Sequence, residues 1–191
     1  MRKKVRFLAE TGMLLALLIA LQWAGSTIPE PLTKQLVTGS LVNCVLAVAV
    51  LMTGVSGGLA VALISPLCAF LLNITPVLMA VPVIMVGNVS FVLLLSLLRR
   101  KAASPWLAAA VTAGAALTKF AILYLLGVKF VCGVLAQPLN GKVFLGAPVM
   151  STKVVKQLMN MFAWPQLVTA LAGCLLAFAV VPVLKKALHR D

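Results

Sequence analysis

The stretch FLAETGMLLALLIALQWAG, residues 7–25, decides the fold of this chain. It is long enough to cross a bilayer as one helix, because roughly 20 apolar residues span the hydrocarbon layer. Within it a small residue stands at every fourth position, at Gly12, Ala16, Ala20 and Ala24. Positions four apart lie on one side of a helix, so these four form a flat strip, here called the small-residue stripe. The stretch therefore predicts a membrane helix with one face suited to close packing.

The small-residue stripe has two interpretations. Helices associate in lipid through close approach of their backbones, which Gly and Ala permit and Leu does not. The stripe can pack against other helices of the same chain, or it can dock a second protein. Spacing alone does not choose between them.

Composition places the chain in the membrane. Its 191 residues are 63% hydrophobic and 10% charged, whereas the apolar fraction of soluble domains is about half. We expect an all-α fold, a single polytopic domain over residues 1–191 with six transmembrane helices. The predicted spans are roughly 7–25, 35–53, 54–72, 76–98, 105–127 and 165–184, with an outer loop at 128–164.

The net charge of +13 indicates how the chain is oriented in the membrane and does not indicate a nucleic-acid partner. The basic residues lie between the predicted spans, not on an aqueous surface interleaved with aromatic residues. With the amino terminus inside, the inner connections hold most of them: Arg2, Lys3, Lys4, Arg6, Arg99, Arg100, Lys101, Lys185, Lys186 and Arg190. The outer connections hold Lys34, Lys129, Lys142, Lys153 and Lys156. Positive charge accumulates on the inner side of membrane proteins, so both termini are expected in the cytoplasm of a cell-membrane protein.

Two segments depart from a plain span. Pro82 and Gly87-Asn88 lie inside the fourth span and predict a kink or local unwinding there, which makes this span a candidate wall of a binding site. In the long outer loop, Ser151 is placed to cap a short amphipathic helix that ends at Phe162. That helix is either an interfacial anchor or a lid over a pocket.

The sequence offers no catalytic site. Its acidic residues are Glu10, Glu30 and Asp191, and none lies near the middle of a predicted span. This argues against a carrier driven through intramembrane carboxylates and against a metal-dependent lipid enzyme. The four cysteines lack metal or redox spacing, and no glycine-rich phosphate loop is present. We expect no catalytic residue, no metal, no cofactor and no ATP hydrolysis by this chain itself.

Polar residues within the spans are the candidate binding residues. Asn43, Lys119 and Gln166 fall in the outer half of the membrane, with Asn88 deeper. A lysine at the centre of a span costs about 2.5–3.5 kcal/mol, so Lys119 either extends its stem to the outer headgroups or meets an anionic ligand from outside. Trp164 either belongs to the aromatic belt at the membrane boundary or stacks on a ring of the ligand. The predicted substrate-binding residues are Asn43, Asn88, Lys119, Trp164 and Gln166.

Three stretches resemble one family of membrane proteins. They are Ala16-Leu-Leu-Ile-Ala20, Thr38-Gly-Ser-Leu-Val-Asn43 and Phe162-Ala-Trp-Pro-Gln-Leu-Val-Thr169. With six spans in so short a chain, they resemble the S components, the substrate-binding subunits, of energy-coupling factor (ECF) transporters. The resemblance implies capture of a vitamin or related micronutrient from outside. It also implies a partner module of one transmembrane scaffold (T) component and two ATPase subunits, which drives release inward by toppling the S component in the bilayer.

The sequence therefore favours a non-catalytic substrate-binding subunit of an ATP-driven importer, docked through the small-residue stripe at Gly12, Ala16, Ala20 and Ala24. The alternative is a self-sufficient small secondary carrier or channel that oligomerises through the first helix. A membrane enzyme of another type is a third, more distant alternative. The residues do not indicate which micronutrient is bound.

Overall fold

A computed structural model of the chain describes residues 2–72, 74, 77–100, 104–144 and 147–188. Position 76, the predicted start of the fourth span, lies outside these residues, as do Lys101, Arg190 and Asp191. The fold is an all-α membrane bundle, as predicted. Six apolar helices form it: α1 (Arg2–Ser26), α2 (Pro31–Thr53), α3 (Val55–Leu71), α4 (Ala80–Leu95), α6 (Pro105–Ile122) and α9 (Pro165–Ala187).

In the described part of the chain, four helices are long and apolar enough to cross a membrane: α1, α2, α9 and the rod that begins with α6. The apolar helices α3 and α4 are shorter. Short elements complete the fold: α5 (Leu97–Arg100), α7 (Ala136–Leu139), the strands β1 (Val143–Phe144) and β2 (Ala147–Pro148), and α8 (Thr152–Phe162). The two strands pair as an antiparallel hairpin.

The outside of the bundle is as apolar as its inside. Large side chains such as Leu8, Leu63, Leu125 and Val183 are exposed on four different helices. A protein in water does not spread exposed apolar residues over all its helices, whereas hydrocarbon requires it. The inner core consists of residues such as Leu18, Leu46, Val50, Phe91 and Ala177.

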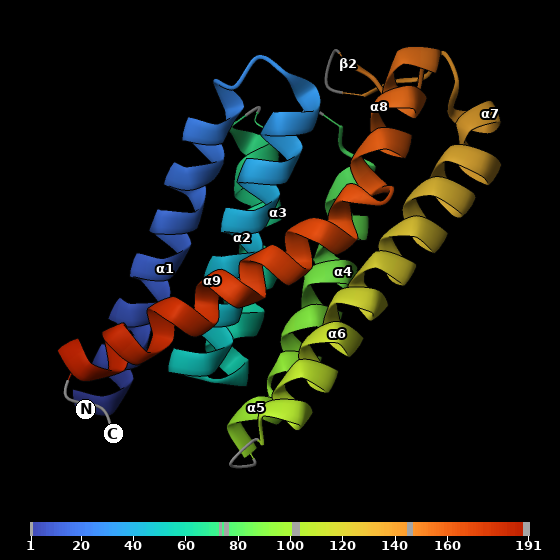
Figure 1. Cartoon of the computed structure of the whole chain (residues 1–191). Helices are drawn as coiled ribbons and strands as arrows, with labels where there is room; N and C mark the ends of the chain where they lie inside the picture. The colour runs from blue at the N-terminus through green and yellow to red at the C-terminus, as the bar shows by residue number, and fades with distance from the viewer. Residues whose placement is uncertain (1, 73, 75–76, 101–103, 145–146, 189–191) are drawn as a thin grey trace.

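Helix α2 lies at the centre and packs on α1, α3, α4 and α9. Figure 1 shows α9 crossing α2 obliquely, with α4 and α6 on the other side of the molecule. The start of α1 and the end of α9 lie at one end of the bundle, and α8 with the β-hairpin lies at the opposite end (Figure 1). This common end for the two termini is what an even number of spans requires.

The crossing of α9 over α2 depends on a glycine. A Cβ atom added to Gly173 would lie 2.5 Å from the Asn43 Cβ atom and 2.8 Å from both the Ser40 carbonyl oxygen and the Cys44 nitrogen. Such distances are too short for any side chain, so the two backbones meet only because residue 173 lacks one. The Asn43 side chain is held at this contact.

The helix of the fifth predicted span continues past Gly127. Helix α6 continues without interruption into the π-helix η1 (Leu123–Leu135) and α7, so that 105–139 is one rod and only the rest of 128–164 forms the outer loop with α8. The apolar residues of this rod extend past Gly127, and α8 covers one side of them, with Val131 and Cys132, while Phe130 and Val134 stay exposed. The Phe162 ring lies directly against Gly127, where a side chain would overlap it.

Of the kink or local unwinding predicted in the fourth span, the unwinding is wrong. Helix α4 is continuous from Ala80 to Leu95 through Gly87 and Asn88. Pro82 lies in its first turn, where the missing N–H has no intrahelical partner to lose. The irregular segment lies instead in the rod that begins with α6. There η1 has the wider hydrogen-bond spacing of a π-helix.

Helix α8 begins as predicted, because the Ser151 hydroxyl accepts a hydrogen bond from the Val154 nitrogen at 3.3 Å. A second cap was not predicted. The Glu30 carboxylate caps α2 by accepting from the nitrogens of Leu32 and Thr33. Hydrogen bonds from Thr33 and then Leu32 hold the pKa of Glu30 below its usual value, so this capping contribution is lost as the pH falls through that lowered pKa.

We expect Gly173→Ala to lower the free energy of unfolding by about 1–3 kcal/mol, since the added methyl group must force α9 away from α2. The matched control is Gly114→Ala on α6, where an added Cβ meets nothing within 4 Å. That control should be neutral or slightly stabilising because Ala favours a helix. Unfolding of both variants in mixed micelles measures the difference, and equal stability of the two would contradict the close α2–α9 contact.

Candidate functional site

The centre of the bundle holds one lysine. Lys119, on α6, is only 3% exposed. Its Nζ atom donates hydrogen bonds to Asn43 Oδ1 on α2 and, at 2.8 Å, to Asn88 Oδ1 on α4. The side chain therefore does not extend to the outer headgroups. Three of the predicted binding residues, from three helices, meet directly, and Asn88 lies beside Lys119 rather than at a separate depth.

A chain of hydrogen bonds leads from this lysine toward α8. Asn43 Nδ2 donates to Thr169 Oγ1 at 3.3 Å, and Thr169 Oγ1 donates to the Gln166 carbonyl oxygen at 3.1 Å. Gln166 Nε2 then donates to the Met161 carbonyl oxygen, near the end of α8, at 2.8 Å. Each link donates in the same direction, away from Lys119, and the bonds through Asn43 and Thr169 polarise one another, whereas the last bond starts from a separate group, the Gln166 side-chain amide. We call Asn43, Asn88, Lys119, Gln166 and Thr169 the polar cluster.

Two residues of this region were not predicted as site residues. Thr169 joins Asn43 to Gln166, and the Phe91 ring lies 5.1 Å from Lys119 Nζ. Both could have been found from helical spacing, since Thr169 follows Gln166 by three positions and Phe91 follows Asn88 by three. A cation over an aromatic face is attracted by the ring quadrupole, so Phe91 stabilises the charge from its apolar side.

One donor of the polar cluster has no acceptor among the described residues. Asn88 is 1% exposed, and its Nδ2 atom makes no hydrogen bond there, although its Oδ1 atom accepts from Lys119. A buried amide N–H without a partner costs about 1–3 kcal/mol. The two atoms of one amide group are joined through a single carbon, so this N–H lies within a few ångströms of the ammonium group.

Trp164, also predicted as a binding residue, is 56% exposed. It immediately precedes α9 at the end of the bundle opposite the two termini, two residues before the buried Gln166. Of the two interpretations of this tryptophan, the exposed position favours the aromatic belt. A contact of Trp164 with a ligand stays a prediction.

The apolar face of helix α8 packs on the protein and not on the membrane surface. Leu158 and Phe162 are fully buried, in a second core that includes Val131 and Cys132 of η1. Its polar residues Lys153, Lys156, Gln157 and Asn160 are exposed. An interfacial anchor would turn its apolar side to lipid, so the structure favours a cover packed on the protein itself over an anchor.

The small-residue stripe is not used inside the chain. Gly12, Ala16, Ala20 and Ala24 are all exposed on α1, while Leu18 on the other side is buried. A Cβ atom added to Gly12 would meet nothing within 4 Å. The structure therefore does not support the first interpretation of the stripe, in which it packs against other helices of the same chain.

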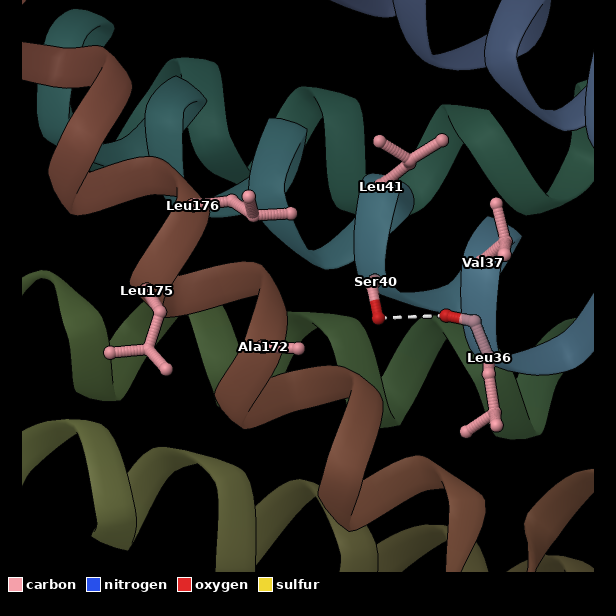
Figure 2. A pocket seen from close by; sticks show the side chains of 7 residues that line it. All are labelled: Leu36, Val37, Ser40, Leu41, Ala172, Leu175 and Leu176. Carbon is pink, nitrogen blue, oxygen red and sulfur yellow. Dashed lines mark hydrogen bonds between the residues drawn. The ribbon is translucent and has the colours of Figure 1, made fainter. Parts of the chain in front are cut away.

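A groove of about 520 Å³ lies between α2 and α9, and it shares no residue with the polar cluster. Figure 2 shows its lining: Leu36, Val37, Ser40, Leu41, Ala172, Leu175 and Leu176. Its one polar side chain, Ser40, donates its hydroxyl to the Leu36 carbonyl oxygen of its own helix at 2.7 Å (Figure 2). The groove has no polar group available to orient a polar nutrient, so the polar cluster is the candidate binding site.

Comparison with sequence models of known families gave a match that covers nearly the whole chain. The family described as "ECF transporter, substrate-specific component" matches residues 6–185, nearly the whole chain. The chain belongs to this family. Comparison with curated proteins and with solved structures gave no match. The protein is therefore an S component, a substrate-specific subunit of a transporter in a membrane.

Family membership agrees with the chemistry of this S component. Among the described residues, no three His, Cys, Asp or Glu side chains gather as a metal site would require. The polar cluster instead consists of amides, one hydroxyl and one ammonium group. Such groups bind and orient a solute by hydrogen bonds.

We expect Asn88→Leu to lower the free energy of unfolding by about 1–3 kcal/mol or more, because a buried ammonium group then lacks one acceptor. Adding Lys119→Met removes that charge, so the double variant should recover part of the loss. A double-mutant cycle, measured by unfolding in mixed micelles, gives the coupling between the two residues. Strictly additive effects would show that Lys119 does not depend on Asn88.

Proposed function

We propose that this S component captures a vitamin or related micronutrient at the outer face of the cell membrane and delivers it inward with an ATP-driven module. The observation that carries the proposal is the polar cluster around Lys119 in an otherwise apolar bundle. A membrane protein tolerates buried polar groups of this kind chiefly where they serve a substrate or ion. Substrate binding accounts for the buried ammonium group and for the orphan donor on Asn88 together.

The direction of entry follows from the polar cluster. Its hydrogen bonds run from Lys119 to the Met161 carbonyl oxygen on α8, at the end opposite the two termini (Figure 1). Lys4, Lys185 and Lys186 lie near the termini, and the positive-inside rule assigns that end to the cytoplasm. In this proposal the ligand enters from outside past α8, which acts as a lid.

The lid is held by few polar contacts. The Met161 carbonyl oxygen accepts from Gln166 Nε2 at 2.8 Å and from Gln35 Nε2 of α2 at 3.4 Å. The polar cluster is buried, so a ligand reaches it only when an outer element moves. Opening α8 requires breaking these two hydrogen bonds and the apolar contacts of Leu158 and Phe162 with η1.

Transport needs a partner, because the chain has no ATP-binding loop. The proposed partners are a transmembrane scaffold (T) component and two ATPase subunits, docked on the small-residue stripe of α1. The stripe is exposed along several turns and bears no long side chain, so another helix can approach its backbone closely. It shares no residue with the polar cluster, so docking and capture can be separated by mutation.

Co-purification tests the proposal directly. The tagged protein, extracted in detergent from its own cells, should retain ATPase subunits and a small molecule identified by mass spectrometry. Uptake into liposomes should require the ATPase module and ATP. Transport by the purified chain alone would instead establish a self-sufficient carrier.

We expect Ala16→Trp and Ala20→Trp to retain the ligand yet lose the ATPase module and ATP-driven uptake, since a bulky ring holds a partner helix away from the stripe. The matched control is Ala113→Trp, an equal enlargement at an exposed position of α6. It should keep both the ligand and the module. If the stripe variants lose the ligand while the module still co-purifies, docking on the stripe is wrong.

A further inference from the structure

Each acceptor oxygen of the two asparagines beside Lys119 already accepts a hydrogen bond. Asn43 Oδ1 and Asn88 Oδ1 both accept from Nζ. Two donors remain: the third N–H of the ammonium group, which donates to no described residue, and Asn88 Nδ2. An ammonium group has three donors and no acceptor. The site therefore offers hydrogen-bond donors to a ligand.

The charge of the site is also uncompensated within the described bundle. Glu10 pairs with Arg6 near the start of α1, and Glu30 caps α2 at the opposite end. Neither carboxylate is a partner of Lys119, whose ammonium group contacts only uncharged amide oxygens and the Phe91 ring among the contacts described. A single negative charge supplied from outside would neutralise the ammonium group inside an apolar bundle.

We infer that the ligand of this S component carries an anionic oxygen group, bound by Lys119 Nζ and Asn88 Nδ2. This rests on the proposed function and adds the chemical class of the substrate. One charge on the protein favours one charge on the ligand, so a carboxylate fits better than a doubly charged phosphate ester. A cationic ligand is excluded, because it would face the ammonium group with no intervening carboxylate.

Asn88→Asp separates charge from shape. Aspartate has nearly the same size as asparagine and keeps the oxygen that accepts from Lys119. Its carboxylate becomes the counter-ion of Lys119, so the protein should stay folded at least as well as the parent. An anionic ligand then meets an ion pair with no net charge, and the new carboxylate repels it. Its retention should therefore fall at least about tenfold.

The experiment compares the parent protein, Lys119→Met, Asn88→Asp and the control Ala113→Trp, each purified from the same cells, after size-exclusion and thermal-unfolding checks. Metabolites released by denaturation are quantified by mass spectrometry, before and after carbodiimide coupling to an amine, which labels carboxylates, and before and after phosphatase treatment. We expect a carboxylate compound enriched in the parent and the control and at least about tenfold depleted in both site variants.

The other outcomes discriminate between the two proposals. A neutral or cationic compound, or an anion retained by Asn88→Asp, overturns the anionic assignment but leaves the capture function standing. A phosphatase-sensitive compound would support an anionic ligand but show that its anionic group is a phosphate ester and not a carboxylate. If the parent enriches no compound over an unrelated membrane protein prepared in parallel, both the inference and the proposed function fail. Should Lys119→Met fail to fold, Asn88→Asp alone decides.

Discussion

The buried ammonium group of Lys119 constrains how the helices of this bundle pack. Lys119 lies in an apolar interior, where a charge without hydrogen-bond acceptors would be far more costly than a polar residue at the surface. The acceptors come from Asn43 of α2 and Asn88 of α4. Because both are short side chains, α2, α4 and α6 must meet at one depth. The other buried polar side chains, such as Ser65 and Thr112, are uncharged and impose no comparable requirement.

A small residue brings a fourth helix to the same place. Gly173 lets α9 lie directly against α2 beside Asn43, which brings Thr169 within reach of the asparagine amide. In lipid, where apolar side chains gain nothing by leaving their solvent, such close backbone contacts stabilise the bundle together with the hydrogen bonds they permit. The same kind of residue on the outer side of α1 has no partner in the described chain. The molecule thus uses small residues inside for packing and leaves another set exposed.

The outer end is built as a second unit on the same rod. There α8 buries Leu158 and Phe162 against η1, apart from the main core that contains Phe91 and Leu46. The link between the two units is polar, through Gln166 and the Met161 carbonyl oxygen. Hydrogen bonds exchange with water or ligand more readily than a packed core repacks, which suits the lid role proposed for α8.

Sequence alone determined the membrane class, the helix count, the short helix after Ser151 and the family, because each depends on local composition, spacing or a short motif. It also identified Asn43, Asn88, Lys119 and Gln166 as exceptional, since polar residues within apolar spans are conspicuous. It did not indicate that the helix of the fifth span continues past Gly127, since periodicity does not tell whether an apolar face meets lipid or another helix. Only the tertiary structure decided that Lys119 points inward to two amides, that Phe91 and Thr169 join it, and that the small-residue stripe stays uncovered. These outcomes depend on which faces of distant helices meet, and that is settled by packing across the whole bundle rather than by any one segment.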